Sequence, residues 1–180
     1  ISTKNWFLFS MSTPLLHQVY VWLCWRSELC WKTISQTIGF KVYAIIFIII
    51  MILRLLSIGL CFVDYGTWYA PGWVAWSISV LIFIPFIYTI YSIKKYFGFM
   101  RATGIDHFDP SYNDIPFERR GIFKWTSNAM YTFATAVFFG FAISAGSKAM
   151  FIFAVYTYIG AWLHYLCTEK EDFKVIYRNY

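Results

Sequence analysis

The chain has 180 residues, of which 59% are hydrophobic, 23% are aromatic and only 13% are charged. Charged residues make up about a quarter of an ordinary soluble domain. This composition therefore excludes an ordinary soluble domain and indicates a protein embedded in a lipid bilayer. The formal net charge of +6 does not indicate a nucleic-acid partner, since the basic residues stand in short segments between apolar runs, where they set topology beside anionic lipid.

An apolar, aromatic segment opens the chain at residues 6–25. Its length allows a crossing, but Pro14, His17 and Gln18 interrupt it. Three arrangements therefore stay open, namely a fifth transmembrane helix, a re-entrant helix and an interfacial helix. A tilted or re-entrant helix is favoured.

A first firm span follows at residues 42–63, where the roughly 20 apolar residues that a crossing needs are interrupted by one charge, Arg54. A charge at this depth is unfavourable, so Arg54 either pairs with Asp64 or a polar group of another helix, or belongs to a functional site. A second span at residues 72–93 contains Pro85, which membrane helices tolerate when neighbouring groups satisfy the freed carbonyl.

The third apolar block, residues 129–167, is too long for one crossing and carries a turn-compatible stretch at 145–148, so it predicts a helical hairpin. Basic residues concentrate in segment 94–128 and in tail 168–180, which the positive-inside rule places together on the cytoplasmic side. The prediction is an all-α polytopic membrane helix bundle of four firm transmembrane helices plus the N-terminal apolar helix. It forms a single integral membrane domain, residues 1–180, in which segment 94–128 caps the cytoplasmic mouth.

Candidate chemistry lies first in the acidic, turn-rich stretch between Gly104 and Glu118. Such a stretch supplies a general base for a substrate amine, or it is an ordinary solvated loop. Its candidates for proton transfer are Asp106, His107, Asp109, Asp114 and Glu118.

A second polar group lies near the end of the last span. His164, Thr168 and Glu169 are spaced to approach one face of a helix, close to the predicted mouth. There they suit the ribose or the amino group of a cofactor. The alternative for His164 is a hydrogen-bonded residue at a helix interface.

The basic residues Arg119, Arg120 and Lys124 stand just before the hairpin at headgroup depth. They either bind a lipid phosphate or only anchor the topology. The sequence has no Ser-His-Asp order, CxxC pair, P-loop or GxGxxG, and its four cysteines lack metal-ligand spacing, so no metal site is expected.

The most informative stretch is the start of the hairpin. A turn, Gly121-Ile-Phe123, is followed by a basic residue and then by Asn128-Ala-Met-Tyr131, and an acid, Glu169, stands after the hairpin. This order resembles the integral-membrane methyltransferases that include isoprenylcysteine carboxyl methyltransferase and phosphatidylethanolamine N-methyltransferase. Their signature is a Gly-x-Tyr turn, a basic stretch, Arg-His-Pro-x-Tyr or Asn-Pro-Met-Tyr, and an acidic pair near the C-terminus.

The chain departs from this signature at several positions. Phe123 stands for the common tyrosine, Ala129 for the usual proline and Lys170 for the second acid. Asn128 replaces the histidine of the carboxyl methyltransferases and favours the phospholipid branch, which often has asparagine there.

The resemblance implies that S-adenosylmethionine binds at the cytoplasmic mouth and that a lipidic acceptor, most simply the amine of phosphatidylethanolamine or a methylated derivative, enters sideways from the bilayer. The cofactor-binding residues that it implies are Gly121, Phe123, Asn128, Met130, Tyr131, His164, Thr168 and Glu169. The candidates for removing a proton from the amine are Asn128 through a held water, His107 and Asp106. Arg119 and Arg120 would hold the lipid phosphate, in either a bacterial inner membrane or the endoplasmic reticulum.

Other functions share parts of this pattern. An isoprenylcysteine-type carboxyl methyltransferase uses the same cofactor on another acceptor. Membrane sterol and steroid reductases have a similar Gly-x-Phe turn but use NADPH, and a non-enzymatic membrane scaffold needs neither ligand. No oligomeric state follows from the sequence.

Overall fold

The computed structural model describes residues 2–177, which form helices and turns and no strand. The long helices are α1 (Thr3–Trp31), α3 (Gly39–Leu55), α5 (Trp73–Ser92), α7 (Thr135–Ala145) and α8 (Lys148–His164). Short helices are α2 (Thr33–Thr37), α4 (Leu60–Val63), α6 (Phe99–Ala102) and α9 (Lys170–Ile176). Turns of 3₁₀ type are η1 (Leu56–Gly59), η3 (Ile105–His107), η4 (Pro110–Tyr112) and η5 (Gly121–Lys124), and π-helical turns are η2 (Ile93–Phe97), η6 (Met130–Ala134) and η7 (Tyr165–Glu169).

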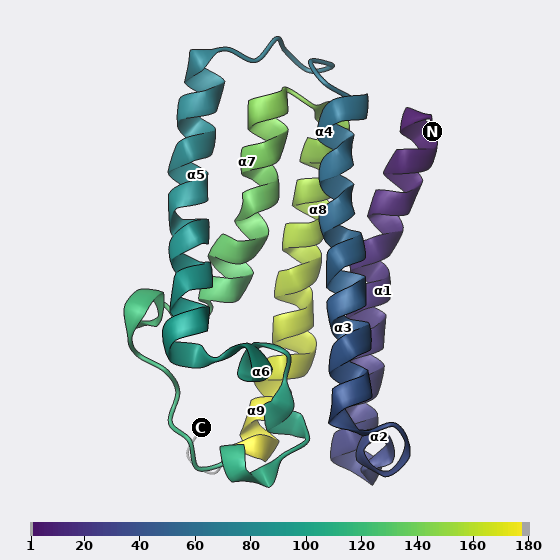
Figure 1. The fold of residues 1–180 in the computed structure, drawn as a ribbon, viewed down its shortest axis with the longest axis vertical. Coiled ribbons are helices and arrows are strands. Elements are labelled where there is room, and N and C mark those ends of the chain that lie inside the picture. Colours follow the sequence, from purple (N-terminus) through teal and green to yellow (C-terminus); the bar gives the residue numbers. More distant parts are fainter. Residues whose placement is uncertain (1, 178–180) are drawn as a thin grey trace.

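The long helices run side by side along the long axis of the molecule (Figure 1). Helix α7 packs between α5 and α8, and α1 packs against α3 and α8. In the described part of the chain, three continuous helical stretches are long and apolar enough to cross a membrane, namely Gly39–Val63, Trp73–Phe97 and Lys148–Ile176, and Met130–Ala145 is a shorter apolar one. Large apolar side chains remain exposed along α3 and α5, as a lipid environment requires. The predicted all-α membrane helix bundle is confirmed.

Helix α1 is one continuous helix of 29 residues with Pro14 inside it. At about 1.5 Å per residue it is roughly 43 Å long, which exceeds the ~30 Å hydrocarbon thickness. It lies along the bundle and does not double back (Figure 1). Of the two favoured arrangements, the re-entrant helix is therefore wrong, whereas a tilted helix agrees with this length.

The hairpin turn predicted at 145–148 is present between α7 and α8. Gly146 adopts a left-handed conformation with φ of 56°, and an added Cβ there would overlap the Tyr69 carbonyl oxygen. Ser147 caps α8, and its hydroxyl donates to the Asp64 carboxylate at 2.7 Å, as does the Ala149 amide at 2.8 Å. Partial burial alone would raise the pKa of Asp64, but these hydrogen bonds outweigh it and hold the pKa below its ordinary value.

Asp64 is thus occupied at the hairpin turn, and the expected pairing of Arg54 with Asp64 does not form. The physical reason is distance along the bundle, because Arg54 lies a few helical turns below the loop that holds Asp64. Arg54 instead turns inward, where it is 6% exposed.

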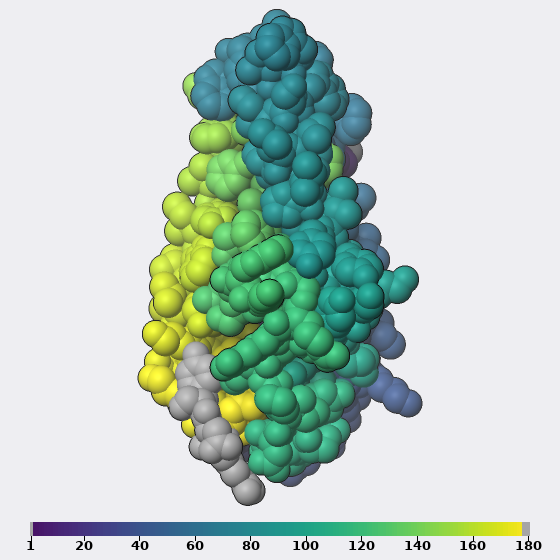
Figure 2. Space-filling view, turned by 90° about the vertical axis from the view of Figure 1, so that its left-hand side faces the viewer, coloured from purple at the N-terminus to yellow at the C-terminus, as the bar shows by residue number. Residues whose placement is uncertain are grey.

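The opposite end of the bundle gathers the polar segments. Segment 94–128 lies beside the last helix, and Figure 2 shows this segment, in green, against the C-terminal residues, in yellow, at the lower end of the molecule. The predicted meeting of cap and tail is thereby seen for residues up to 177, while residues 178–180 of the tail lie outside the described residues.

Candidate functional site

A cavity of about 470 Å³ lies at the cap end, between residues 117–131 and the junction of α8 with α9. We call it the mouth cavity. Its wall mixes apolar rings with polar and charged groups, and includes Arg119, Phe123, Asn128, Tyr131 and Glu169. A cavity of this size and composition is typical of a binding site for a small molecule.

A second cavity, the interior cavity, of about 460 Å³, lies among α1, α3, α5, α7 and α8. Most of its wall is apolar. Ile48, Ile52 and Leu55 on α3 and Ile90 on α5 line it and are nevertheless 39–54% exposed. Since α3 packs on α1 while α5 packs on α7, these exposed lining residues show that the interior cavity opens between α3 and α5 toward the surrounding lipid.

The mouth and interior cavities adjoin each other, because several residues belong to both walls. These shared residues are Phe97, Phe117, Met130, Tyr131, Glu169 and Phe173. Four of them lie in π-helical turns: Phe97 in η2, Met130 and Tyr131 in η6, and Glu169 in η7. Such turns insert an extra residue into a helix and are frequent at functional sites.

Glu169 is the most unusual residue of this shared wall. It is 9% exposed, and among the described residues no partner reaches its Oε2 atom. The buried carboxylates of Asp106 and Asp172 act on it by repulsion and do not neutralise it. A buried carboxylate in this state is costly unless a cation or a hydrogen-bond donor joins it, so Glu169 is suited to a positively charged ligand.

The turn before α7 sets the position of the opposite wall. Gly121 has a φ of 61°, and an added Cβ would overlap the Ser92 hydroxyl, which accepts a hydrogen bond from the Ile122 amide at 3.0 Å. Phe123 follows, buried and stacked on Phe97 at 5.2 Å between ring centroids. The glycine therefore allows the close approach that fixes this wall to α5.

The second motif element continues this wall. The backbone amide of Asn128 donates to the Thr126 hydroxyl at 3.1 Å. The side chain of Asn128 takes no part in this bond, and the residue lines the mouth cavity. Tyr131 packs against Tyr165 of η7 at 5.1 Å between ring centroids. The hydroxyl of Thr135 donates to the Tyr131 carbonyl, which satisfies a backbone group of the π-helical turn.

The structure distributes the predicted cofactor residues as follows. Phe123, Asn128, Met130, Tyr131 and Glu169 line the mouth cavity together. Gly121 supports its wall, Thr168 is buried next to Glu169, and His164 lines the interior cavity.

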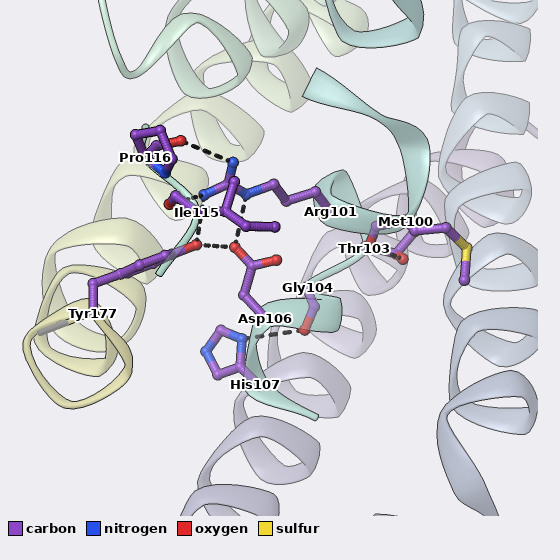
Figure 3. A network of polar contacts seen from close by, with 9 residues as sticks. All are labelled: Met100, Arg101, Thr103, Gly104, Asp106, His107, Ile115, Pro116 and Tyr177. Carbon is purple, nitrogen blue, oxygen red and sulfur yellow. Dashed lines mark hydrogen bonds and ion pairs between the residues drawn. The ribbon is translucent and has the colours of Figure 1, made fainter. Parts of the chain in front are cut away.

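At the cap end of the interior cavity, Arg101 joins the cap to the C-terminal segment (Figure 3). Its guanidinium donates to Asp106 at 3.0 Å, to the Tyr177 hydroxyl at 2.9 Å and to the carbonyls of Pro116 and Ile115. The Tyr177 hydroxyl in turn donates to Asp106. One Asp106 oxygen is thereby engaged, whereas among residues 2–177 nothing bonds the other, Oδ1.

His107 lies beside this network, sandwiched between other groups. Its ring stacks on Trp25 at 4.0 Å, and its nitrogens lie 3.3 Å from the Gly104 carbonyl and 3.3 Å from the Asp172 carboxylate. Arg26 pairs with Asp172 at 2.9 Å. Because both ring nitrogens are engaged with groups of the protein, neither is free to contact a ligand in this arrangement.

The predicted lipid-binding arginines are divided. Arg119 is exposed and lines the mouth cavity. Arg120 forms an ion pair with Glu118 at 2.8 Å and lies over the Tyr96 ring. The hydrogen bond from Arg120 is the main reason that the pKa of Glu118 is lowered to about 2.

Sequence reasoning did not assign site roles to Arg101, Asp172, Tyr177 and Trp25. Arg101 was interpreted only as one of the basic residues that set the membrane topology. Its position between Gly98 and Gly104 was the feature of the sequence that could have indicated a site residue. Asp172 follows Glu169 by three residues and so shares its helix face, which was a usable signal for a buried acid.

Comparison with known families decides the class. A family model described as phospholipid methyltransferase matches residues 74–180. The chain belongs to this family. No curated protein and no solved structure matches the chain significantly.

Residues 74–180 run from α5 to the C-terminus, so the match includes both motif elements and Glu169 and leaves α1 and α3 outside. The chain is an integral membrane methyltransferase, and the family match gives no support to the reductase and scaffold alternatives.

Proposed function

We propose that this protein transfers a methyl group from S-adenosylmethionine to the amine of phosphatidylethanolamine or of its methylated derivatives. The observation that carries the proposal is the wall shared by a polar and an apolar cavity, with the unpartnered carboxylate of Glu169 in it. A methyl transfer between a polar donor and a lipid needs this arrangement, because it holds both reactants close and excludes water.

The mouth cavity fits S-adenosylmethionine by the chemistry of its wall. Glu169 presents a buried, unpartnered carboxyl oxygen to the amino acid part of the cofactor, and Asn128 presents its side-chain amide to it. The rings of Phe123 and Tyr131 offer π faces to a cation, and Met130 adds apolar contact. When bound, the cofactor supplies an electrophilic methyl group on a sulfonium.

Further predicted residues act at a distance from the cofactor in this proposal. Gly121 keeps the wall of the mouth cavity close to α5. His164 directly precedes the η7 turn and Thr168 lies in it next to Glu169, so both set the direction of Glu169.

The interior cavity suits the lipid, since it is largely apolar and open between α3 and α5. An ammonium group has to lose a proton before its nitrogen can attack. Asp106 lines this cavity with its unengaged Oδ1, so we assign the proton to that atom. His107, paired with Asp172, and Asn128 are positioning residues in this scheme.

The active end faces the cytoplasm in this proposal, in a bacterial inner membrane or in the endoplasmic reticulum. Basic residues gather at this end, among them Lys94, Lys95 and Arg119, which favours the cytoplasmic side. Arg119 and Arg120 meet the lipid phosphate at the bilayer surface before the lipid enters.

The test is calorimetric binding of S-adenosylmethionine to the detergent-purified chain, together with labelled methyl transfer into phosphatidylethanolamine vesicles. Loss of a charge-assisted hydrogen bond removes about 1.5–3 kcal/mol, so Glu169→Gln is expected to weaken cofactor affinity about 10- to 100-fold. Glu171→Gln is the matched control, because Glu171 is exposed and pairs with Lys174.

The proposal is refuted if the wild-type chain binds no S-adenosylmethionine, or if Glu169→Gln binds it as tightly as the wild type. Label that enters a prenylcysteine carboxylate and no phospholipid would move the acceptor to the isoprenylcysteine branch.

A further inference from the structure

Arg54 and His17 lie on α3 and α1, in the part of the chain that the family match does not include. Both line the interior cavity. In the described part of the chain, the Nε and Nη2 atoms of Arg54 and the Nε2 atom of His17 are buried without a hydrogen-bond partner, and no carboxylate pairs with Arg54.

An unpaired guanidinium inside a membrane bundle is unfavourable and calls for an anionic partner. The arginine is held against the Phe138 ring, at 5.6 Å from its centroid, and His17 packs edge-on against Phe47 at 4.8 Å. Both side chains therefore hold unpartnered nitrogen atoms beside a cavity that opens to lipid. The carboxylates of Asp106 and Glu169 line the same cavity, but at its cap end.

We propose that Arg54, assisted by His17, binds the phosphate of the phospholipid acceptor inside the bundle and so sets the depth of its amine. This assignment rests on the proposed function, since it takes the phospholipid as acceptor. Arginine suits the task because its planar fork matches two phosphate oxygens.

The distances along the bundle agree with this assignment. A two-point contact puts the phosphorus about 4 Å from the guanidinium carbon. Four covalent bonds of about 1.5 Å each separate phosphorus from the ethanolamine nitrogen, so the nitrogen reaches at most about 5 Å further.

The ethanolamine nitrogen therefore lies at most about 9 Å along the bundle from the Arg54 guanidinium, which is at the same height as the Phe138 ring. Tyr131 precedes Phe138 by nearly two helical turns, or about 10 Å of rise. The amine therefore comes to the shared wall, beside Tyr131 and Glu169, which is where the methyl donor is proposed to end.

The test compares lipids that differ only in the phosphate. Native mass spectrometry in detergent would measure binding of dioleoyl phosphatidylethanolamine and of oleylamine, which has the amine and no phosphate, to the wild type and to Arg54→Met. The expected result is a loss of about 10- to 100-fold for the phospholipid and no change for oleylamine. Lys41→Met, an exposed charge on the same helix, is the control and should change neither.

Two further readouts separate the possible failures. S-adenosylmethionine affinity should be unchanged in Arg54→Met, and the apparent melting temperature of the ligand-free protein should rise, because an unpaired buried charge has been removed. If the wild type binds no S-adenosylmethionine yet loses phospholipid binding with Arg54→Met, the proposed function fails while this phosphate site stands.

Equal losses for phosphatidylethanolamine and oleylamine, or no loss for either, would overturn the proposal. Inorganic phosphate that displaces the phospholipid at equal concentration would show that the ligand is a free anion, which also overturns it. Tighter Arg54-dependent binding of oleate than of phosphatidylethanolamine would assign a carboxylate in place of the phosphate.

Discussion

The hydroxyl of Tyr177 offers a sharp test of how the cap is held on the bundle. This hydroxyl donates to Asp106 and accepts from Arg101 at 2.9 Å, and the residue is 5% exposed. Its ring separately packs on Phe117 and Phe173, at 4.7 Å and 5.4 Å between centroids. Tyr177→Phe therefore removes the hydrogen bonds and keeps the ring packing.

The expected loss follows from these contacts. Hydrogen bonds to charged groups contribute about 1.5–3 kcal/mol, and because Arg101 and Asp106 stay paired at 3.0 Å, the loss stays below the 3–5 kcal/mol of a broken buried ion pair. At about 2–4 °C per kcal/mol for a chain of this size, the apparent melting temperature should fall by about 3–12 °C.

The pH dependence adds a second signature. Burial, together with the Asp106 carboxylate, raises the pKa of Tyr177 above its ordinary value. A raised pKa in the folded state means that the stabilisation is complete below the unfolded pKa of about 10 and is lost only as pH rises through the folded value. The difference in melting temperature between wild type and Tyr177→Phe should thus stay constant from pH 6 to 9, because the tyrosine begins to lose its proton only near pH 10.

Thermal melting in detergent would be combined with amide exchange of residues 99–107. The exposed Tyr65 supplies the control, Tyr65→Phe. A melting temperature of Tyr177→Phe equal to that of the control, with unchanged exchange in the cap, would refute the reasoning, because it would show that the bond does not close the cap.

The other predictions concern separate parts of the molecule. Asp64→Ala should lower stability by about 1 kcal/mol, because the Ser147 hydroxyl and the Ala149 amide at the start of α8 lose their acceptor. Since the folded pKa of Asp64 is depressed, the loss should be full above its ordinary pKa of about 3.9 and should shrink below it in melting curves. Gly121→Ala should strain the turn by about 1–2 kcal/mol and weaken S-adenosylmethionine binding in calorimetry, whereas Gly72→Ala, where an added Cβ meets open space, should not. Asp172→Asn should destabilise by about 3 kcal/mol in melting experiments, because Arg26 and His107 lose a fully buried carboxylate, while the exposed Glu171→Gln should be neutral.

The spans and the hairpin were predictable because the bilayer imposes them. A run of apolar residues of the required length, such as 42–63, has few alternatives in lipid, and the stretch 145–148 has few alternatives to a turn between two antiparallel helices. The meeting of cap and tail followed from charge alone, since basic residues mark the same membrane side.

The polar network at the cap was not predictable in the same way. Arg101 meets Tyr177 across 76 positions of sequence, and Asp106 meets Tyr177 across 71. No periodicity links residues so far apart. The partner of Arg54 was misjudged for a related reason, because Asp64 is close in sequence but faces the hairpin turn.

The π-helical turns η2, η6 and η7 supply most of the wall between the two cavities. Each carries one residue more than regular α-helical winding would need. Deleting that residue would restore regular winding and leave the helix beyond the turn close to its present register, so that the change falls on the side chains of the turn itself. A one-residue gap at such a turn in an alignment would thus change which side chains face the ligands, even where the flanking residues are identical. Ligand preference in this architecture therefore depends on the winding of these turns as well as on residue identity.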